Sequence, residues 1–594
     1  MLRSTRRRTR GAGVWAALLL AAMVSLFLYG WVGDMFETRT LIRPDEGRYA
    51  DISREMVASG DWITPRLNGL KYFEKPPLQY WGTAVAFSVF GVESWAARIW
   101  PLFSAVFGMI VVGFTAMRLR TVQDALAIVA VLGSSLLYVV FGMAITLDMA
   151  LSFWLTAAVC AIALALDGPV RAPASRWMLV AWACLAAAVL TKGLIGLVLP
   201  ALAAALYLLT TRQWALLRRV RPVAGTLLLL ALSAPWFVMV QQRNPEFFDF
   251  FFVHEHFQRF LTTEHRRTGA WWYFLAVGAL GFLPWTPMLG AWALSSMRRA
   301  SGSSARAAPV ARDDRGAAER GGAGAIRRAI FPRNGPDRFD ADRWFACLAI
   351  VTIGFFSLSS SKLPGYIVPA FPALAWVVGL QLRRASNRSL VASIVVVVAI
   401  AGAVIAAMPS IGRALDARYE PPLVVGFTAS LTESMVWLAA GGGGAIALVL
   451  ARVRLGAILA LALAGLFCWD HVMDGARLFS PMLSSRQIVA EAFDSERDAL
   501  RTAPFYTVEV FDQTLPFYLG RSVVMVNVTD ELAMGLRSEP ERGIPTLEEW
   551  VARWRALDSG YAFMNGDAYR RLTAAGLPGR VVAVDRKRVI IARR

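Results

Sequence analysis

The chain has 594 residues, of which 56% are hydrophobic and only 18% are charged. Soluble domains carry about 45–50% apolar and about 25% charged residues, so the composition excludes a single soluble globular domain and indicates an integral membrane protein. The net charge of +20 would suggest a nucleic-acid partner in a soluble protein. Here most arginines lie in short loops between apolar segments, which is a topology signal instead, and no nucleic-acid partner is expected.

The first predicted element is an uncleaved transmembrane helix over about 14–32, which follows an arginine-rich N-terminus and has no small-residue cleavage site after it. Later apolar blocks fall near 95–117, 125–143, 146–166, 178–191, 194–210, 222–241, 271–293, 344–360, 365–382, 390–408, 434–451 and 455–470. This makes about thirteen spans, so the two termini are predicted on opposite sides. The arginine-rich loops collect on the side of the N-terminus, as the positive-inside rule requires.

The outer side is therefore predicted to hold loops 33–94 and 242–270, the connection 409–433 and everything after residue 470. On the inner side, residues 297–343 are rich in Ala, Gly, Ser and Arg without periodicity, which predicts a disordered cytoplasmic linker. The tail 471–594 is predicted to be a small α/β domain, because apolar strand patterns alternate with helical ones. The strands are expected at 505–510, 523–528, 561–564 and 581–592, and the helices at 485–500, 547–557 and 567–575.

The first outer loop concentrates charge where the chain has just left the membrane. Asp45, Glu46 and Arg48 come first, and apolar or aromatic residues recur at helical spacing over 49–56. This pattern predicts a short interfacial helix with its acids at the N-terminal end, where the helix dipole favours them. The alternative is an ordinary surface helix without a catalytic role.

The same loop continues into Tyr72-Phe73-Glu74-Lys75-Pro76-Pro77, where the proline pair stiffens the backbone. A rigid Lys75 beside a lipid surface suits a lipid phosphate, because the ammonium group is a compact point charge. An ordinary snorkelling anchor would not need the proline brace. The sequence therefore predicts a phosphate site at Lys75.

Asp148 lies at the outer edge of the fourth span, and an ionisable group at membrane depth is a functional candidate by default. The alternative is a helix cap, although Thr146 could take that place. Two further outer-edge loops each carry one lysine, Lys192 in 191–193 and Lys362 in 359–366. These lysines suit an anionic substrate or, equally, lipid headgroups.

The loop over 242–270 carries three of the four histidines, together with Arg259. His256 could hold a divalent ion with Glu74 or Glu255, but the spacing fixes no third ligand, so this metal signal is weak. His256 and Arg259 are three residues apart, so on a helix they would share a face and could bind one phosphate.

Taken together, the run PDEGRYADISREM, the segment FEKPPLQYW, and the later EHFQRF and SKLPGY resemble the aminoarabinose transferases, lipid A glycosyltransferases of Gram-negative inner membranes. The resemblance implies a polytopic α-helical membrane protein with a GT-C-type fold and a periplasmic α/β domain. It implies transfer of 4-amino-4-deoxy-L-arabinose from undecaprenyl phosphate to a lipid A phosphate on the periplasmic face, which gives resistance to polymyxin and other cationic peptides. The long insert 297–343 departs from the family pattern without touching these motifs.

The resemblance also implies site roles. Lys75, Arg259, Lys362 and Tyr366 would hold the leaving phosphate, and Asp45 and Asp148 would bind the sugar amine or orient the acceptor. Arg48 would pair with Asp45 or a phosphate, and Glu46 is assigned to substrate binding. Glu74 and His256 are the best match to a family metal site, for Zn or Mg, and the resemblance leaves the role of that ion open. The protein is expected to act as a monomer.

Two other classes compete with this reading. A lipid-linked-sugar transporter would explain the spans, but it would more often show an internal repeat of interrupted helices, and none is visible. A protein O-mannosyltransferase-like enzyme using another polyprenyl-phosphate sugar shares the Asp-Glu loop and the fold, so only the acceptor and the sugar separate it from the first reading.

Overall fold

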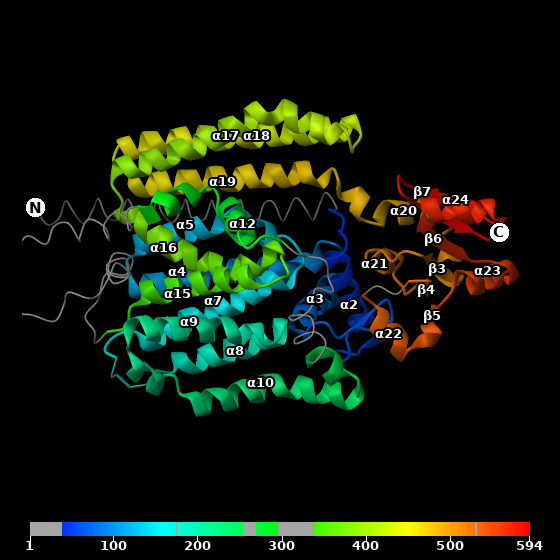
Figure 1. Cartoon of the computed structure of the whole chain (residues 1–594), viewed down its shortest axis with the longest axis horizontal. Coiled ribbons are helices and arrows are strands. Elements are labelled where there is room, and N and C mark those ends of the chain that lie inside the picture. The colour runs from blue at the N-terminus through cyan, green and yellow to red at the C-terminus, as the bar shows by residue number, and fades with distance from the viewer. Residues whose placement is uncertain are drawn as a thin grey trace, which may run out of the picture.

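The computed structural model describes residues 39–170, 172–173, 175–252, 269–291, 293–294, 338–528 and 531–593. A bundle of apolar helices lies at one end of the long axis and a mixed α/β domain at the other (Figure 1). Two helices at the outer end of the bundle, α2 (Asp45–Ser59) and α3 (Leu78–Phe90), lie between these two parts. The predicted fold class, a polytopic helical membrane protein with a C-terminal α/β domain, is confirmed.

Within these ranges, eight helical segments are long and apolar enough to cross a membrane, and a bent pair could form a ninth. The eight contain α4 (Ile99–Leu119), α7 (Leu147–Leu166), α10 (Pro222–Arg243), α15 (Ala341–Leu358), α16 (Phe371–Arg384), α17 (Asn387–Asp416), α18 (Pro421–Leu450) and α19 (Arg454–Arg477). Shorter apolar helices are α8 (Trp177–Lys192), α9 (Ile195–Thr211) and α12 (Tyr273–Gly281). The expected first span over 14–32 and most of the predicted linker 297–343 lie outside the described residues, so the count of thirteen stays a prediction. The described end of that linker is not disordered, because Ala341–Arg343 form the first turn of α15 and Asp340 caps it by accepting the backbone N–H of Arg343.

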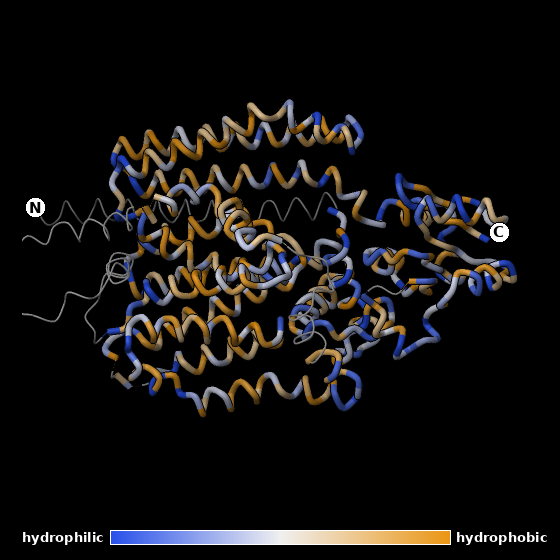
Figure 2. Tube along the Cα trace, in the orientation of Figure 1, coloured by the Kyte–Doolittle hydropathy of each residue, from blue (hydrophilic) through white to orange (hydrophobic). Residues whose placement is uncertain are grey.

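One face of α4 shows why this bundle needs a lipid environment. Five large apolar side chains at alternating spacings of four and three residues are exposed: Phe103, Phe107, Ile110, Phe114 and Met117. Such spacing places them on one side of a helix, and a stripe of that kind facing water would be a strong liability. Apolar residues dominate the helices throughout the bundle, whereas the C-terminal domain is mixed (Figure 2).

Two connections differ from the sequence-based expectation. The predicted outer loop over 409–433 is mostly helical, because α17 continues to Asp416 and α18 begins at Pro421, each helix being 30 residues long. Proline is well suited to the first position of a helix, so Pro421 starts α18 instead of marking a loop. The expected single span over 125–143 is divided into α5 (Val122–Gly133) and α6 (Leu136–Gly142), with a bend of 69° between them.

The C-terminal domain contains a six-stranded sheet of order β5-β4-β3-β6-β8-β7, whose first four strands are parallel. The strands are β3 (Phe505–Val508), β4 (Val524–Val526), β5 (Gly543–Ile544), β6 (Tyr561–Asn565), β7 (Arg580–Val584) and β8 (Arg588–Ala592), and the longer helices are α20 (Arg486–Thr502), α23 (Leu547–Ala556) and α24 (Gly566–Ala574). The single strand predicted over 581–592 is wrong in one respect, because this segment forms a hairpin of two strands, β7 and β8. Asp585 accepts the backbone N–H groups of Lys587 and Arg588 at 2.9 and 2.8 Å, which stabilises the turn.

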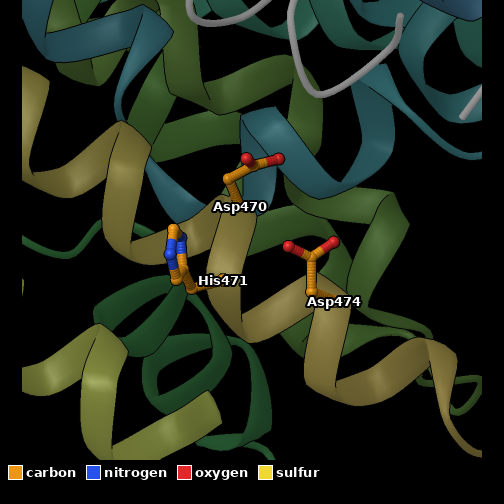
Figure 3. A group of neighbouring side chains, drawn as sticks. All are labelled: Asp470, His471 and Asp474. Carbon is orange, nitrogen blue, oxygen red and sulfur yellow. The ribbon is translucent and has the colours of Figure 1, made fainter. Parts of the chain in front are cut away.

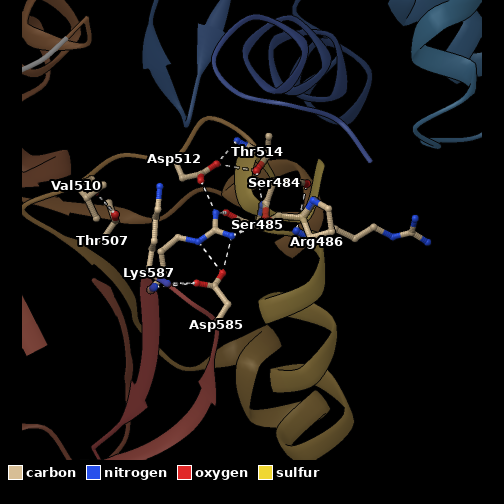
Figure 4. Close-up of polar contacts among 11 residues, drawn as sticks. Ser484, Ser485, Arg486, Thr507, Val510, Asp512, Thr514, Asp585 and Lys587 are labelled. Carbon is tan, nitrogen blue, oxygen red and sulfur yellow. Dashed lines mark hydrogen bonds and ion pairs between the residues drawn. The ribbon is translucent and has the colours of Figure 1, made fainter. Parts of the chain in front are cut away.

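The buried Arg588 joins the segment that follows α19 to this sheet, and Figure 4 labels the partners Asp512, Ser484 and Asp585. Arg588 pairs with Asp512 at 2.8 Å and also donates to the backbone carbonyl of Ser484 at 2.7 Å. The arginine and aspartate side chains are 4% and 0% exposed. Because removing one partner of such a pair strands the other charge, this contact fixes the domain against the chain that leaves the membrane.

The interfacial helix α2 also packs directly on the C-terminal domain. A Cβ atom on Gly47 would lie 2.7 Å from the backbone of Gln513 and Thr514, so only glycine permits this approach. After α2, the side chain of Asn68 exchanges two hydrogen bonds with the backbone of Val523, at 2.9 and 2.7 Å. These contacts hold α2 between the bundle and the sheet.

Candidate active site

The predicted interfacial helix exists as α2, and its second residue anchors it. Glu46 is 2% exposed and receives two hydrogen bonds from Arg98, at 3.0 and 2.7 Å. Burial alone would raise the pKa of Glu46, but Arg98 and then Arg39 outweigh it and hold that pKa below its usual value. The backbone N–H of Ile145 also donates to Glu46 at 3.2 Å. Glu46 therefore joins α2 to the chain just before α7.

Arg48 lies two residues further along α2 and links this helix to the C-terminal domain. Its guanidinium donates to Asp45 at 2.9 Å and forms an ion pair with Glu531, which follows β4. The side chain of Arg48 is 9% exposed, whereas that of Asp45 is 44% exposed. Asp45 is thus the member of this group that is open to a ligand.

Two buried tyrosines flank the charged segment Glu74-Lys75 in the sequence. Tyr72 and Tyr80 are buried, and neither hydroxyl has a hydrogen-bond partner within the described part of the chain. Burial, with the nearby Glu74 carboxylate adding to it, raises the pKa of Tyr80, so that its hydroxyl keeps the proton at neutral pH. Lys75 donates to the backbone carbonyl of Glu74 at 2.7 Å. Two buried phenol donors and a lysine thus lie in one segment close to Arg48.

Asp148 and Lys192, from two different helices, meet at one end of the bundle. Asp148 is in the first turn of α7, and Lys192 ends α8 and forms an ion pair with it. The Nζ atom of Lys192 also lies 4.8 Å from the ring centroid of Tyr366. A Cβ atom on Gly365 would lie 2.2 Å from a carboxylate oxygen of Asp148. Asp148, Lys192 and the loop that carries Gly365 and Tyr366 were marked separately by the sequence, and the structure brings them together.

Lys362 does not join that group. Its ammonium donates to the backbone carbonyls of Phe356 and Ser357 at 3.1 and 2.8 Å, and it lies 5.2 Å from the ring centroid of Phe274. These carbonyls belong to the last turn of α15, where the helix dipole favours a cation. The geometry thus separates Tyr366, next to Asp148, from Lys362, which is 8% exposed.

The predicted metal ligands are only partly described. Glu74 is half-buried in the segment before α3, whereas His256 and Arg259 lie outside the described residues. Among the residues whose positions are described, the group of three or more donors close enough to share an ion is Asp470, His471 and Asp474 on α19 (Figure 3). This group does not include Glu74, so the pairing of Glu74 with His256 stays a prediction.

Comparison with solved structures gives the decisive observation. The chain superimposes on the crystal structure of ArnT from Cupriavidus metallidurans bound to undecaprenyl phosphate, with a TM-score of 0.83 and 32% identity over 98% of both chains. The apo form of the same protein gives a TM-score of 0.81 and 31% identity. The chain belongs to the aminoarabinose transferase family. The GT-C-type architecture expected for its membrane part is confirmed with it.

Other relatives agree with this family. The model of the aminoarabinose transferase C-terminal domain matches residues 495–593, and the model of dolichyl-phosphate-mannose-protein mannosyltransferases matches residues 15–251. Undecaprenyl phosphate-alpha-4-amino-4-deoxy-L-arabinose arabinosyl transferases are 30% identical in Erwinia tasmaniensis, over 64% of this chain and 63% of that protein, and 33% identical in Pseudomonas aeruginosa, over 57% and 55%. The chain thus aligns with less than two thirds of the length of these curated relatives.

The structure places four further residues beside the candidate site residues, and the sequence pattern assigned no specific role to any of the four. Tyr72 and Tyr80 flank the FEKPP segment, so their position in a charged loop was a usable signal. Lys192 was noticed as an outer-edge cation, but its pairing with Asp148 requires knowing that α7 and α8 are neighbours. Nothing in the sequence around Glu531 indicated a role for it, because its partner Arg48 is far away along the chain.

Proposed function

We propose that this protein transfers 4-amino-4-deoxy-L-arabinose from undecaprenyl phosphate to a phosphate group of lipid A. The observation that carries the proposal is the match over the whole chain to a family member crystallised with undecaprenyl phosphate. The convergence of Asp45, Asp148 and cationic side chains at the outer end of the bundle supports it, because a phosphate-to-phosphate transfer needs both cation and sugar contacts.

The reaction forms one bond and breaks one. A lipid A phosphate oxygen attacks the anomeric carbon of the sugar, and the bond between that carbon and the undecaprenyl phosphate oxygen breaks. The electron pair leaves with undecaprenyl phosphate. Since a phosphate monoester has a second pKa of about 6, the acceptor is already ionised at neutral pH and needs no strong base. Positioning and stabilisation of the leaving group then matter most.

The leaving phosphate would be held by Lys75 and Arg259, with the hydroxyls of Tyr72 and Tyr80 as further donors. Both tyrosine hydroxyls are protonated and buried without a partner in the described structure. An unpaired buried hydroxyl carries a desolvation cost, which a bound phosphate oxygen would remove. Lys362 would act less directly, because its ammonium is already held by α15.

The carboxylates of Asp45 and Asp148 would contact the sugar or orient the acceptor. Asp45, which is 44% exposed, would contact the sugar amine or orient the acceptor, and Arg48 would fix Asp45 in place. Asp148 would contact the amine with Lys192 and Tyr366 beside it. We assign Glu46 a positioning role instead of substrate contact, because its two carboxylate oxygens are already engaged by Arg98 and two backbone N–H groups.

Glu74 and His256 would hold a divalent metal ion if the family pattern applies, and such an ion would neutralise phosphate charge. No step above is routed through it. The arginine-rich inner loops support an inner-membrane location with the site and the C-terminal domain in the periplasm. The monomeric state is part of the same proposal.

The second candidate function is protein O-mannosyl transfer, which the match of residues 15–251 to the mannosyltransferase model favours. The two are separated by mass spectrometry of lipid A from a Gram-negative strain that lacks its own aminoarabinose transferase but makes the donor. With this protein present, lipid A should gain the mass of one aminopentose. Unmodified lipid A, together with newly glycosylated protein, would favour the second candidate.

A further inference from the structure

A cavity lies between α2 and the C-terminal domain. Its volume is about 1100 Å³. One wall is formed by the end of α2 and by Val92, which follows α3. The other is formed by α20, by α21 (Leu515–Leu519) and by the two residues after α21. It is lined by Arg54, Val57, Ala58, Val92, Ala490, Phe493, Asp494, Arg497, Arg501, Phe517, Tyr518, Leu519, Gly520 and Arg521.

This cavity is separate from the candidate active site. Arg54 follows Asp45 by nine residues on α2, and at 3.6 residues per turn this places the two side chains on opposite faces of the helix. The cavity therefore lies on the face of α2 opposite to the one that carries Asp45.

Four arginines and one aspartate line the cavity. Arg54 is paired with Asp51 and Glu55, which leaves Arg497, Arg501 and Arg521 against Asp494. Arg497 and Arg501 are one helical turn apart on α20, and in the described structure neither guanidinium forms an ion pair. Arg521 donates to the backbone carbonyl of Arg501 at 3.0 Å, while its Nε atom is buried without a described partner. Like charges one turn apart repel, and an anion between them would reverse that cost.

Much of the rest of the lining is apolar and continues onto an exposed apolar face of α3. Phe493, Phe517 and Leu519 provide apolar walls. Val92 lines the cavity, is itself 41% exposed, and follows Val85, Val89 and Phe90, which are 54%, 68% and 52% exposed on α3. Exposed apolar residues in such a row mark a lipid-contacting surface. The cavity thus offers arginines to a headgroup and an apolar exit for chains.

From these features we propose that the cavity binds the phosphate headgroup of an anionic membrane phospholipid. The phosphodiester lies between Arg497, Arg501 and Arg521, and the acyl chains leave past Val92 along the exposed face of α3. Arginine suits this role because its planar fork matches phosphate oxygens. A lipid in this place joins α2 to the C-terminal domain at the membrane surface.

The test uses the purified full-length protein in detergent, with lipid binding followed by native mass spectrometry. The probes are phosphatidylglycerol, phosphatidylcholine and inorganic phosphate. The variant is Arg497→Ala with Arg501→Ala, and the matched control is Arg553→Ala with Arg570→Ala. The control arginines lie on α23 and α24 of the same domain and are 58% and 75% exposed, so both double variants lose the same charge.

Phosphatidylglycerol should bind the unmodified protein and the control with equal affinity. Its affinity for the Arg497/Arg501 variant should be lower by at least about tenfold, as expected for losing charge-assisted hydrogen bonds. Phosphatidylcholine should bind all three weakly. Equal phosphatidylglycerol binding by the two double variants would overturn the proposal. Displacement of the lipid by an equal concentration of inorganic phosphate would also overturn it, in favour of a soluble-anion site. Single Arg497→Gln and Arg501→Gln variants, which keep most of each side chain, serve if the double variant unfolds, and each should weaken phosphatidylglycerol binding.

Discussion

The carboxylate of Asp148, at the start of α7, is paired with the ammonium of Lys192, at the end of α8, beside the ring of Tyr366. The side chains are 13% and 15% exposed, so both charges are largely withdrawn from water. In such surroundings a charge pair is costly to break. The pair is therefore well placed to hold a charged sugar in a fixed geometry.

The first prediction follows from that pair. Asp148→Asn should lower transfer activity by about 100-fold, since misplacing a reacting group by about 1 Å can cost that much. The loss should be similar from mildly acidic to mildly basic pH, because a binding role does not depend on proton abstraction. Initial rates at several pH values check this. Recovery of the variant at high pH would instead identify Asp148 as a general base.

The second prediction concerns Glu46 as a structural anchor. Glu46→Gln should destabilise the protein by about 3–5 kcal/mol, because it removes the carboxylate charge that the buried Arg98 pairs with. The matched control is Glu549→Gln on α23, whose pair with Arg553 is 42% and 58% exposed and should contribute less than about 1 kcal/mol. Denaturant unfolding in detergent measures both. Equal effects would contradict the anchoring role.

The third prediction separates ligand contact from packing at the buried tyrosines. Tyr80→Phe should lower activity while leaving the unfolding temperature unchanged or slightly higher, because the lost hydroxyl has no partner in the described structure. In Tyr138→Phe the opposite is expected, since that hydroxyl donates to the Ala105 carbonyl at 2.8 Å. The control should lose stability and keep its activity. Full activity in Tyr80→Phe would remove this residue from the site.

The fourth prediction is a pH dependence at the end of α2. Burial and then the neighbouring Asp51 raise the pKa of Glu55 from 4.5 to about 8, although Glu55 accepts the Gly69 N–H at 2.7 Å. The folded protein therefore binds this proton more tightly than the unfolded chain does. Its stabilising contribution is complete below pH 4.5 and is lost as the pH rises to about 8.

Glu55→Gln is the variant that checks this dependence, because glutamine mimics the protonated side chain. Unfolding temperatures of the two proteins should approach each other at low pH and diverge toward pH 8, with the natural protein the less stable. Parallel curves over that range would show that Glu55 titrates normally.

The sequence predicted well those features that depend on local pattern. The apolar blocks, the helix beginning at Asp45 and the α/β tail all follow from spacing along the chain. The hairpin at Asp585 was missed because two short strands joined by a tight turn resemble one longer strand. The bend between α5 and α6 was missed because hydropathy does not record direction.

The pairing of site residues could not be predicted, because it depends on which elements become neighbours. The sequence marked Asp148 and Lys192 separately, and only the packing of α7 against α8 joins them. Glu46 and Asp45 are adjacent in sequence, yet successive residues on a helix point in different directions. One therefore meets Arg98 in the interior while the other stays open to a ligand.

The central claim is tested most directly with purified protein, undecaprenyl-phosphate aminoarabinose and lipid A in detergent. The account predicts lipid A that gains one aminopentose and an equal amount of released undecaprenyl phosphate. Lys75→Ala should abolish both, whereas Lys587→Ala in the β7–β8 turn should have little effect. Absence of product with the natural protein, under conditions in which the Cupriavidus metallidurans relative forms it, would contradict the account.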